Sequence, residues 1–250
     1  MTRLLLVNPN TTEAVTGLMM RSAVAVAAPG VEIAAVTAAR GVPYISSRAE
    51  ALIGGVIALE MLAEASPAPD AALLAAFGDP GLAGAREMFD FPVVGVSEAA
   101  MLAACMLGAK FLIISFTSAM LGWYRECVAM HGLDARCAGV VALDLPFGAL
   151  DDVQVAHGEA LIAFAQRQAK ACGADCLIFA GAPLAGLAHA ARDRLDLPVV
   201  DPIAAAVKLA EALVALSPIK ARAGSYARPA AKDSICLSAA LANRLRRTDG

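Results

Sequence analysis

Short apolar runs alternate with longer amphipathic segments along most of this chain. The apolar runs lie at residues 3–7, 31–36, 71–77, 93–96, 111–116, 140–145, 176–180 and 199–200. Runs of this length, bounded by glycine, proline or polar residues, are typical of buried parallel strands, and the segments between them have helical periodicity. The pattern therefore predicts an α/β fold in which helices cover parallel sheets.

Two pairs of segments indicate an internal duplication. Residues 91–100 (FPVVGVSEAA) resemble residues 197–206 (LPVVDPIAAA), and residues 78–84 (GDPGLAG) resemble residues 181–186 (GAPLAG). We therefore expect two pseudo-symmetric, Rossmann-like halves, each a roughly four-stranded parallel sheet flanked by helices. Because open parallel sheets bind ligands beyond the carboxyl ends of their strands, the active-site cleft is expected between the halves.

The predicted division assigns residues 1–97 to the first half and residues 98–203 to the second. A helix predicted at residues 203–216 crosses back, so residues 204–250 are expected to pack on the first half. The tail after Pro218 carries basic residues among glycine, proline and serine, which predicts a loosely structured surface strap. These basic residues are Lys220, Arg222, Arg228 and Lys232.

Composition argues against several classes of function. The chain has 20 Lys and Arg against 23 Asp and Glu, a formal net charge of -3, and no basic stripe, so no nucleic-acid partner is expected. Apolar residues make up 59% of the chain, but none of their runs reaches the roughly 18 residues of a membrane helix. The apolar N-terminal run is too short for a signal peptide, so a cytoplasmic location without a membrane partner is expected.

Neither the cysteines nor the histidines form a recognisable site in the sequence. The six cysteines show no disulfide framework and are predicted to be reduced and mainly structural. Cys172 and Cys176 lack the second ligand pair of a zinc site, and His131, His157 and His189 are isolated, so no metal is expected. There is no GxGxxG or phosphate-loop lysine motif, so no cofactor is expected.

Loops at the predicted strand ends carry the candidate binding residues. Asn10 is predicted to cap a helix, with Glu13 returning the bond, and Thr117 begins a helix in the corresponding loop of the second half. Free backbone donors at a helix start suit a carboxylate or an imide carbonyl, although a plain helix cap explains the first loop as well. Two such loops facing each other favour anion binding. The candidate substrate contacts in these loops are Asn8, Asn10, Thr11 and Ser118.

Acid or base roles are open to four residues, one of which is Thr117. Asp79 lies between two glycines that let a ligand approach the backbone, but it could equally cap the helix predicted at residues 81–88. Ser97 is likewise a natural helix cap. Tyr124 lies in a Trp-Tyr-Arg cluster that is also typical of interface packing, and Ser47 is a candidate substrate contact in a polar segment at residues 41–48.

Taken in order, four motifs resemble those of hydantoin and allantoin racemases, in the aspartate/glutamate/hydantoin racemase superfamily. They are NPNTT at residues 8–12, FGDPGL at 77–82, VVGVSEAAM at 93–101 and VVDPIAAAVKLAEALV at 199–214. The resemblance covers nearly the whole chain. It implies a homo-oligomeric enzyme of two similar halves that moves a proton at a carbon next to a carbonyl, without a cofactor, using two cysteines on opposite faces of the substrate.

This sequence departs from the family at both cysteine positions. Ala76 precedes FGDPGL, and in the second loop neither Ala180 nor Gly181 can move a proton. The thiol-pair mechanism is therefore excluded, and the small residues predict a roomier and less reactive cleft. The residues expected to line the substrate in these two loops are Ala76, Phe77, Gly78, Ala180, Gly181, Ala182 and Pro183.

The sequence is compatible with three functions. The first is a racemase or isomerase of a hydantoin, allantoin or related amino-acid derivative, with Asp79, Ser97, Thr117 and Tyr124 as the acid/base set. Against it stand the high ordinary pKa values of Ser, Thr and Tyr. The second is a decarboxylase, another lyase or a hydrolase of the same superfamily, and the third is a catalytically degenerate binding protein. In each case the expected partner is a small carboxylate or cyclic ureide.

Overall fold

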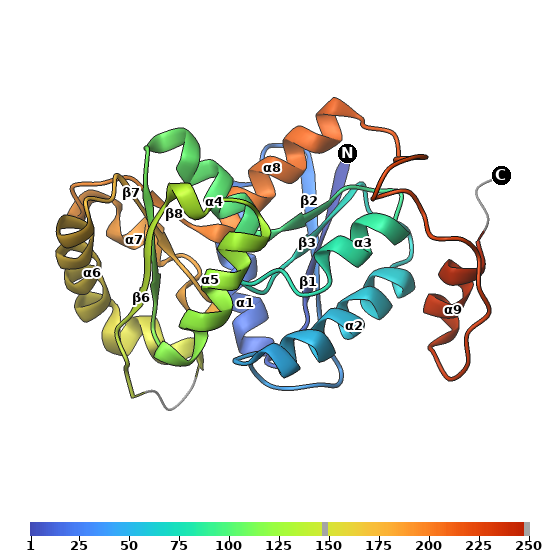
Figure 1. Cartoon of the computed structure of the whole chain (residues 1–250), viewed down its shortest axis with the longest axis horizontal. Helices are drawn as coiled ribbons and strands as arrows, with labels where there is room; N and C mark the ends of the chain where they lie inside the picture. Colours follow the sequence, from blue (N-terminus) through green and yellow to red (C-terminus); the bar gives the residue numbers. More distant parts are fainter. Residues whose placement is uncertain (147–149, 248–250) are drawn as a thin grey trace.

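The computed structural model describes residues 1–146 and 150–247, and this part of the chain forms two parallel four-stranded sheets (Figure 1). The strand order is β2-β1-β3-β4 in the first sheet and β6-β5-β7-β8 in the second, so one topology occurs twice. The predicted α/β fold with two similar halves is confirmed. The strands are β1 (Thr2–Asn8), β2 (Val31–Thr37), β3 (Ala71–Leu74), β4 (Val93–Gly95), β5 (Phe111–Ser115), β6 (Cys137–Ala142), β7 (Cys176–Phe179) and β8 (Val199–Val200).

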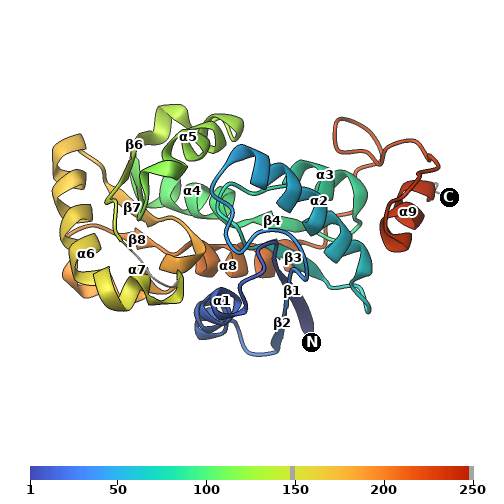
Figure 2. The same ribbon diagram turned by 90° about the horizontal axis from the view of Figure 1, so that it is seen from below.

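Helices connect the parallel strands and cover both faces of each sheet, as Figure 2 shows for α1 on one side of the first sheet and α2 with α3 on the other. Each predicted strand forms, although β6 begins and ends earlier than residues 140–145. The helices are α1 (Glu13–Val26), α2 (Arg48–Glu64), α3 (Leu82–Met88), α4 (Val96–Leu107), α5 (Leu121–Met130), α6 (Val153–Cys172), α7 (Leu187–Ala191), α8 (Pro202–Leu216) and α9 (Ala239–Arg246).

Alternation along the central strands explains these layers. In β1, Leu4 and Leu6 pack with α1, α4 and α8, whereas Leu5 and Val7 pack with α2, α3 and α9. In the second half, Ile114 packs with α6 and α7, and Ile113 on the opposite face of β5 packs with α4 and α5. Each sheet is therefore buried on both faces, which is why its strands are nearly continuous apolar runs.

The chain returns to the first half after its last strand. Helix α8 packs against α1, α4 and β3, and Asp201 fixes its start by accepting hydrogen bonds from the backbone N–H groups of Ile203 and Ala204. The tail is more ordered than predicted, because α9 buries Leu241 against the α2 and α3 layer. Between residues 217 and 238 it has no helix or strand and runs along the surface. None of the described helices combines the length and hydropathy needed to span a bilayer.

A contact between the α3 start and α2 gives a first prediction. A Cβ added to Gly81 would lie 2.9 Å from the backbone oxygen of Gly55, and Gly81 has a φ of +85°. Gly81→Ala should therefore lower the free energy of unfolding by about 2–4 kcal/mol through strain and a backbone collision. Gly84→Ala is the matched control, because its Cβ would lie 3.6 Å from Leu59 Cδ1 in ordinary contact. That change should raise stability by about 0.5–1 kcal/mol, and urea unfolding of both variants measures the difference. Equal stability of the two would contradict this account.

Candidate functional site

The carboxyl ends of β3 and β7 meet at a very small cavity between the halves. It has a volume of about 10 Å³, and a second cavity of about 10 Å³ adjoins it through Phe77, Gly181 and Ala182. Since a buried water needs roughly 10–15 Å³, neither cavity has room for a substrate in this conformation. The residues that line the first one are Asn10, Tyr44, Ile45, Ala76, Phe77, Tyr124, Gly181 and Ala182.

Aromatic rings fill the space that the missing thiols were expected to open. The ring of Tyr124 lies 4.7 Å from that of Phe77 and 5.7 Å from that of Trp123, and Tyr44 lies 5.7 Å from Phe116. Tyr124 is only 1% exposed. The prediction of a roomier cleft is therefore wrong, because large side chains from α5 and from the segment before α2 occupy the volume.

Two tyrosine hydroxyls point towards the loop in which the resemblance places the second cysteine. A Cβ added to Gly181 would lie 3.5 Å from Tyr44 Oη and 3.6 Å from Tyr124 Oη. The buried Tyr44 hydroxyl has no hydrogen bond of acceptable geometry. Two of the side chains that line the cavity thus bring phenol hydroxyls close to Gly181.

Burial keeps both phenols in their neutral form. It raises the pKa of Tyr44 well above its usual value, and the neighbouring Tyr124 hydroxyl raises that pKa further. Burial likewise raises the pKa of Tyr124. At neutral pH both groups therefore carry their proton and can donate a hydrogen bond to a carbonyl oxygen.

The backbone at Gly181 has adapted to glycine. Its φ of +108° lies in a region that residues with a Cβ rarely adopt, and an added Cβ would also lie 3.1 Å from the Phe116 ring. A cysteine could occupy this position only if the loop changed its conformation. The difference from the family pattern thus extends beyond one exchanged side chain.

Asp79 and Ser97 hold the loop after β3 and do not line either small cavity. Asp79 Oδ1 accepts from the Ser97 N–H at 2.9 Å and Oδ2 from the Glu98 N–H at 2.8 Å. Asp79 therefore caps α4, and the prediction that it caps the helix at residues 81–88 is wrong. Ser97 is not a cap either, since it lies inside α4, where its Oγ accepts from the Gly78 N–H at 2.7 Å. Their catalytic role stays a prediction.

His131, the residue that follows α5, joins this network, so the prediction that it is isolated is wrong. Its Nε2 lies 3.3 Å from Asp79 Oδ2, and its Nδ1 lies 3.5 Å from Glu98 Oε1. Burial lowers the pKa of His131, but Asp79, Cys127 and Glu98 outweigh burial and raise it to about 11. Burial raises the pKa of Glu98, and contact with His131 and Arg86 reverses this and lowers it to about 2. The network ties α5 to the β3–α3 loop.

Asn8 and Asn10 organise the loop after β1. Asn8 Oδ1 accepts from the backbone N–H of Asn10, and Asn10 Oδ1 accepts from the Ile45 N–H at 2.7 Å. Asn10 therefore does not cap α1, which follows Thr12 without a side-chain cap, and Glu13 bonds to Thr37 instead. The predicted capping pair is wrong, but Asn10 does reach the cavity and positions the segment that carries Tyr44.

Of the remaining predicted residues, only Ala182 is among those that line the cavity. Thr117 accepts from the Ala119 N–H, Ser118 is exposed, and Ser47 caps α2. The Thr11 N–H bonds to Val42 O, while Ala180 and Pro183 are buried behind the loop. From the segment around Tyr44, the sequence analysis selected Ser47 as the substrate contact and not Tyr44. A tyrosine beside a buried isoleucine and near a glycine turn is too common a pattern to identify it.

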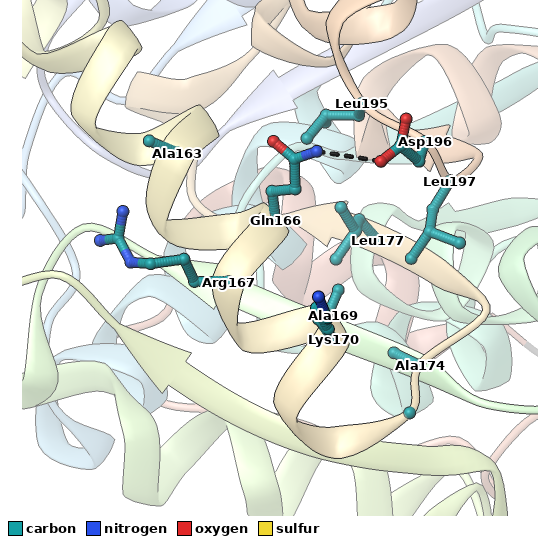
Figure 3. A pocket seen from close by; sticks show the side chains of 11 residues that line it. Ala163, Gln166, Arg167, Ala169, Lys170, Ala174, Leu177, Leu195, Asp196 and Leu197 are labelled. Atoms are coloured by element: carbon teal, nitrogen blue, oxygen red, sulfur yellow. Dashed lines mark hydrogen bonds between the residues drawn. The ribbon is translucent and has the colours of Figure 1, made fainter.

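A hollow of about 670 Å³ lies far from this chemistry, between α6 and the start of β7 (Figure 3). Gln166 and Asp196 hydrogen-bond across its edge at 3.0 Å. Leu177 is the second residue of β7, so this hollow lies at the amino end of the second sheet. Ligands of such sheets bind at the opposite end, and we place the candidate site at the small cavity for that reason.

Comparison with known proteins agrees with this fold. A family model described as Asp/Glu/Hydantoin racemase matches residues 4–210. The chain is 34% identical to a hydantoin racemase of Paenarthrobacter aurescens over 92% of its length and 98% of that protein. It is 30% identical to a hydantoin racemase of Rhizobium meliloti over 91% of its length and 95% of that protein. An allantoin racemase structure from Klebsiella pneumoniae superposes with a TM-score of 0.91 at 35% identity, covering 96% of this chain and 99% of that one.

Proposed function

Because this chain belongs to the Asp/Glu/hydantoin racemase family, we propose that it is a cofactor-independent racemase of a hydantoin or related cyclic ureide. In this proposal the phenols of Tyr44 and Tyr124 take the place of the two thiols. The observation that carries the proposal is the convergence of both hydroxyls on Gly181, within 3.6 Å of one point. The relatives that act on hydantoin and allantoin support the choice of substrate class.

The chemistry requires one phenol in each protonation state. Once the two side chains have moved apart to admit the substrate between them, the phenolate removes the proton from the carbon next to the carbonyl and the electron pair moves onto the carbonyl oxygen. The other phenol then returns a proton to the opposite face. A raised pKa makes the phenolate scarce at neutral pH, but it also makes each phenolate that forms a stronger base. Slow turnover at neutral pH is therefore expected.

Substrate entry requires the aromatic side chains to move. A cavity of about 10 Å³ admits no cyclic ureide, and its aromatic walls come from α5 and from the segment before α2. At the surface, the ion pair of Arg48 with Glu126 joins the first residue of α2 to α5, and the two side chains are 62% and 57% exposed. Solvent screens such a pair, so it is a weak restraint on opening.

Proton exchange in deuterated buffer tests the proposal. Each enantiomer of 5-substituted hydantoins and of allantoin is incubated with the protein, and NMR follows the α-hydrogen while polarimetry follows inversion. Loss of the signal together with inversion supports the racemase. Release of carbon dioxide from an added malonate would favour a decarboxylase. Ligand-induced thermal stabilisation without any exchange would favour a binding protein.

The pH dependence gives a second prediction. The pKa values of both tyrosines are raised above their usual value. The phenolate fraction should therefore rise about tenfold per pH unit at every pH below these raised pKa values. The exchange rate should therefore increase with a slope of about one from pH 7 to pH 10, after correction for the reaction without enzyme. A plateau that begins near pH 7 would show that another group is the base.

A further inference from the structure

Behind the cavity, three side chains of different chemistry meet in one cluster. Ligand atoms of Asp79, Cys127 and His131 lie within 4.8 Å of one another. Asp79 and Cys127 are buried, and the His131 side chain is 10% exposed. A carboxylate oxygen, a thiol sulfur and an imidazole nitrogen are the three donor types that zinc accepts in proteins.

The spacing of two of these atoms fits a metal better than a hydrogen bond. His131 Nε2 lies 3.3 Å from Asp79 Oδ2, yet it has no hydrogen-bond partner of acceptable geometry. Zinc bonds to nitrogen and oxygen are about 2.0–2.1 Å long, so a tetrahedral ion separates such ligand atoms by roughly 3.3–3.4 Å. The unpartnered nitrogen therefore lies at the distance from the carboxylate that a shared ion would impose.

The groups around the cluster form the outer shell that a metal site requires. The second ring nitrogen of His131 faces Glu98 Oε1 at 3.5 Å, and Glu98 is held in turn by Arg86. Asp79 Oδ1 accepts from the Ser97 N–H. A histidine ligand usually presents its other nitrogen to a carboxylate, and ligating carboxylates are themselves hydrogen-bonded. Both conditions are met here.

We propose that Asp79 Oδ2, Cys127 Sγ and His131 Nε2 bind one Zn²⁺, with water as the fourth ligand. This assignment replaces the expectation from sequence that the chain has no metal ligands. Zn²⁺ exchanges for the thiol proton of Cys127 and the proton of the His131 imidazolium, so the net charge of the cluster is unchanged. The ion fastens α5, which carries Tyr124, to the loop that carries Ala76.

Metal binding is measured in protein in which the exposed Cys172 and Cys236 are replaced by serine. After dialysis against a chelator, titration with Zn²⁺ should give one ion per chain and a higher Tm. Titration with Co²⁺ should give the near-ultraviolet band of a thiolate ligand. Changing an outer-shell residue weakens metal binding by about 10–100-fold, so Cys127→Ser and His131→Asn should each weaken it by more than about 100-fold. Cys105→Ser, on α4, is the matched control and should leave both signals unchanged.

Two results would overturn the proposal. One is a cobalt–thiolate band that survives in Cys127→Ser, and the other is protein that takes up no zinc at neutral pH. Circular dichroism in chelator establishes that each variant folds. Zinc X-ray absorption of the unmutated chain reads the ligands directly, and one sulfur with nitrogen and oxygen neighbours is the expected set. None of these measurements uses enzyme activity, so they stand apart from the racemase proposal.

Discussion

Replacing Asp79 with alanine is expected to lower the free energy of unfolding by about 3–5 kcal/mol. Its carboxylate is buried, accepts hydrogen bonds from the Ser97 and Glu98 N–H groups at the start of α4, and faces the His131 imidazole. Removing the carboxylate leaves the Ser97 and Glu98 N–H groups without their acceptor. It also removes one of the charged partners of the His131 imidazolium. Each loss is costly inside a protein because water cannot replace the missing acceptor.

Asp79→Asn separates charge from hydrogen bonding. Asp79 has a φ of +48°, which asparagine tolerates better than alanine, and the amide oxygen keeps one acceptor for α4. The asparagine variant should therefore lose less stability than the alanine variant in chelator-treated protein. Asp134→Ala, at a site that is not buried, should change stability by less than about 0.5 kcal/mol. Urea unfolding measures all three, and a loss below about 1 kcal/mol in Asp79→Ala would contradict the capping role.

The same network predicts how stability varies with pH. The pKa of His131 is raised to about 11 in the folded chain, whereas an unperturbed histidine titrates near 6.5. In chelator-treated protein, protonation of His131 therefore stabilises the fold fully below about pH 6.5, and this contribution declines as pH rises towards 11. Asp79→Ala should reduce this slope, because His131 then loses a partner that holds its proton. NMR titration of the imidazole measures the change.

The sequence was enough to predict the sheets because their information is local. Apolar runs such as residues 3–7 and 111–116 can be recognised one at a time. A parallel strand that is buried on both faces must consist almost entirely of apolar residues, so such runs identify it. The duplication then implied the second sheet from the first.

The site was harder to predict because its contacts join distant segments. Asp79 looks like a cap for the helix that follows it, yet it caps α4, which begins beyond the next strand. His131 has no local motif, and only the fold brings it to Asp79. Cavity volume was mispredicted for a related reason, because the small size of Ala76 and Gly181 says nothing about which rings fill the space beside them.

Glycines on both sides of the cleft allow aromatic side chains to pack closely against the loops. The glycine conformation at residue 181 and the ring of Phe116 disfavour a side chain on that loop. On the other side, a Cβ at Gly78 would lie 2.2 Å from the Trp123 ring, so the β3–α3 loop accepts α5 only because it has glycine there. A thiol at residue 181 could therefore not be restored by substitution alone, because the loop would also have to change its conformation.

Tyr124→Phe should lower the rate of α-proton exchange by about 100–1000-fold while leaving the fold intact. The change removes one oxygen and keeps the ring that packs against Phe77 and Trp123. Tyr44→Phe should act similarly and should not destabilise the protein, because the Tyr44 hydroxyl has no hydrogen-bond partner to lose. Exchange measured by NMR and thermal melting by circular dichroism separate the two effects.

Tyr226→Phe is the matched control, since that tyrosine is 43% exposed and lies on the tail after α8. This variant should catalyse α-proton exchange of the substrate at the same rate as the unmutated chain. The double variant Tyr44→Phe/Tyr124→Phe distinguishes a pair from two separate contributors. If the phenols act as base and acid of one reaction, the second substitution should cost little once the first has abolished proton transfer. If each merely binds substrate, the two losses should multiply and should fall on KM. Unchanged exchange in both single variants would exclude the tyrosines and return Asp79 and Ser97 to consideration.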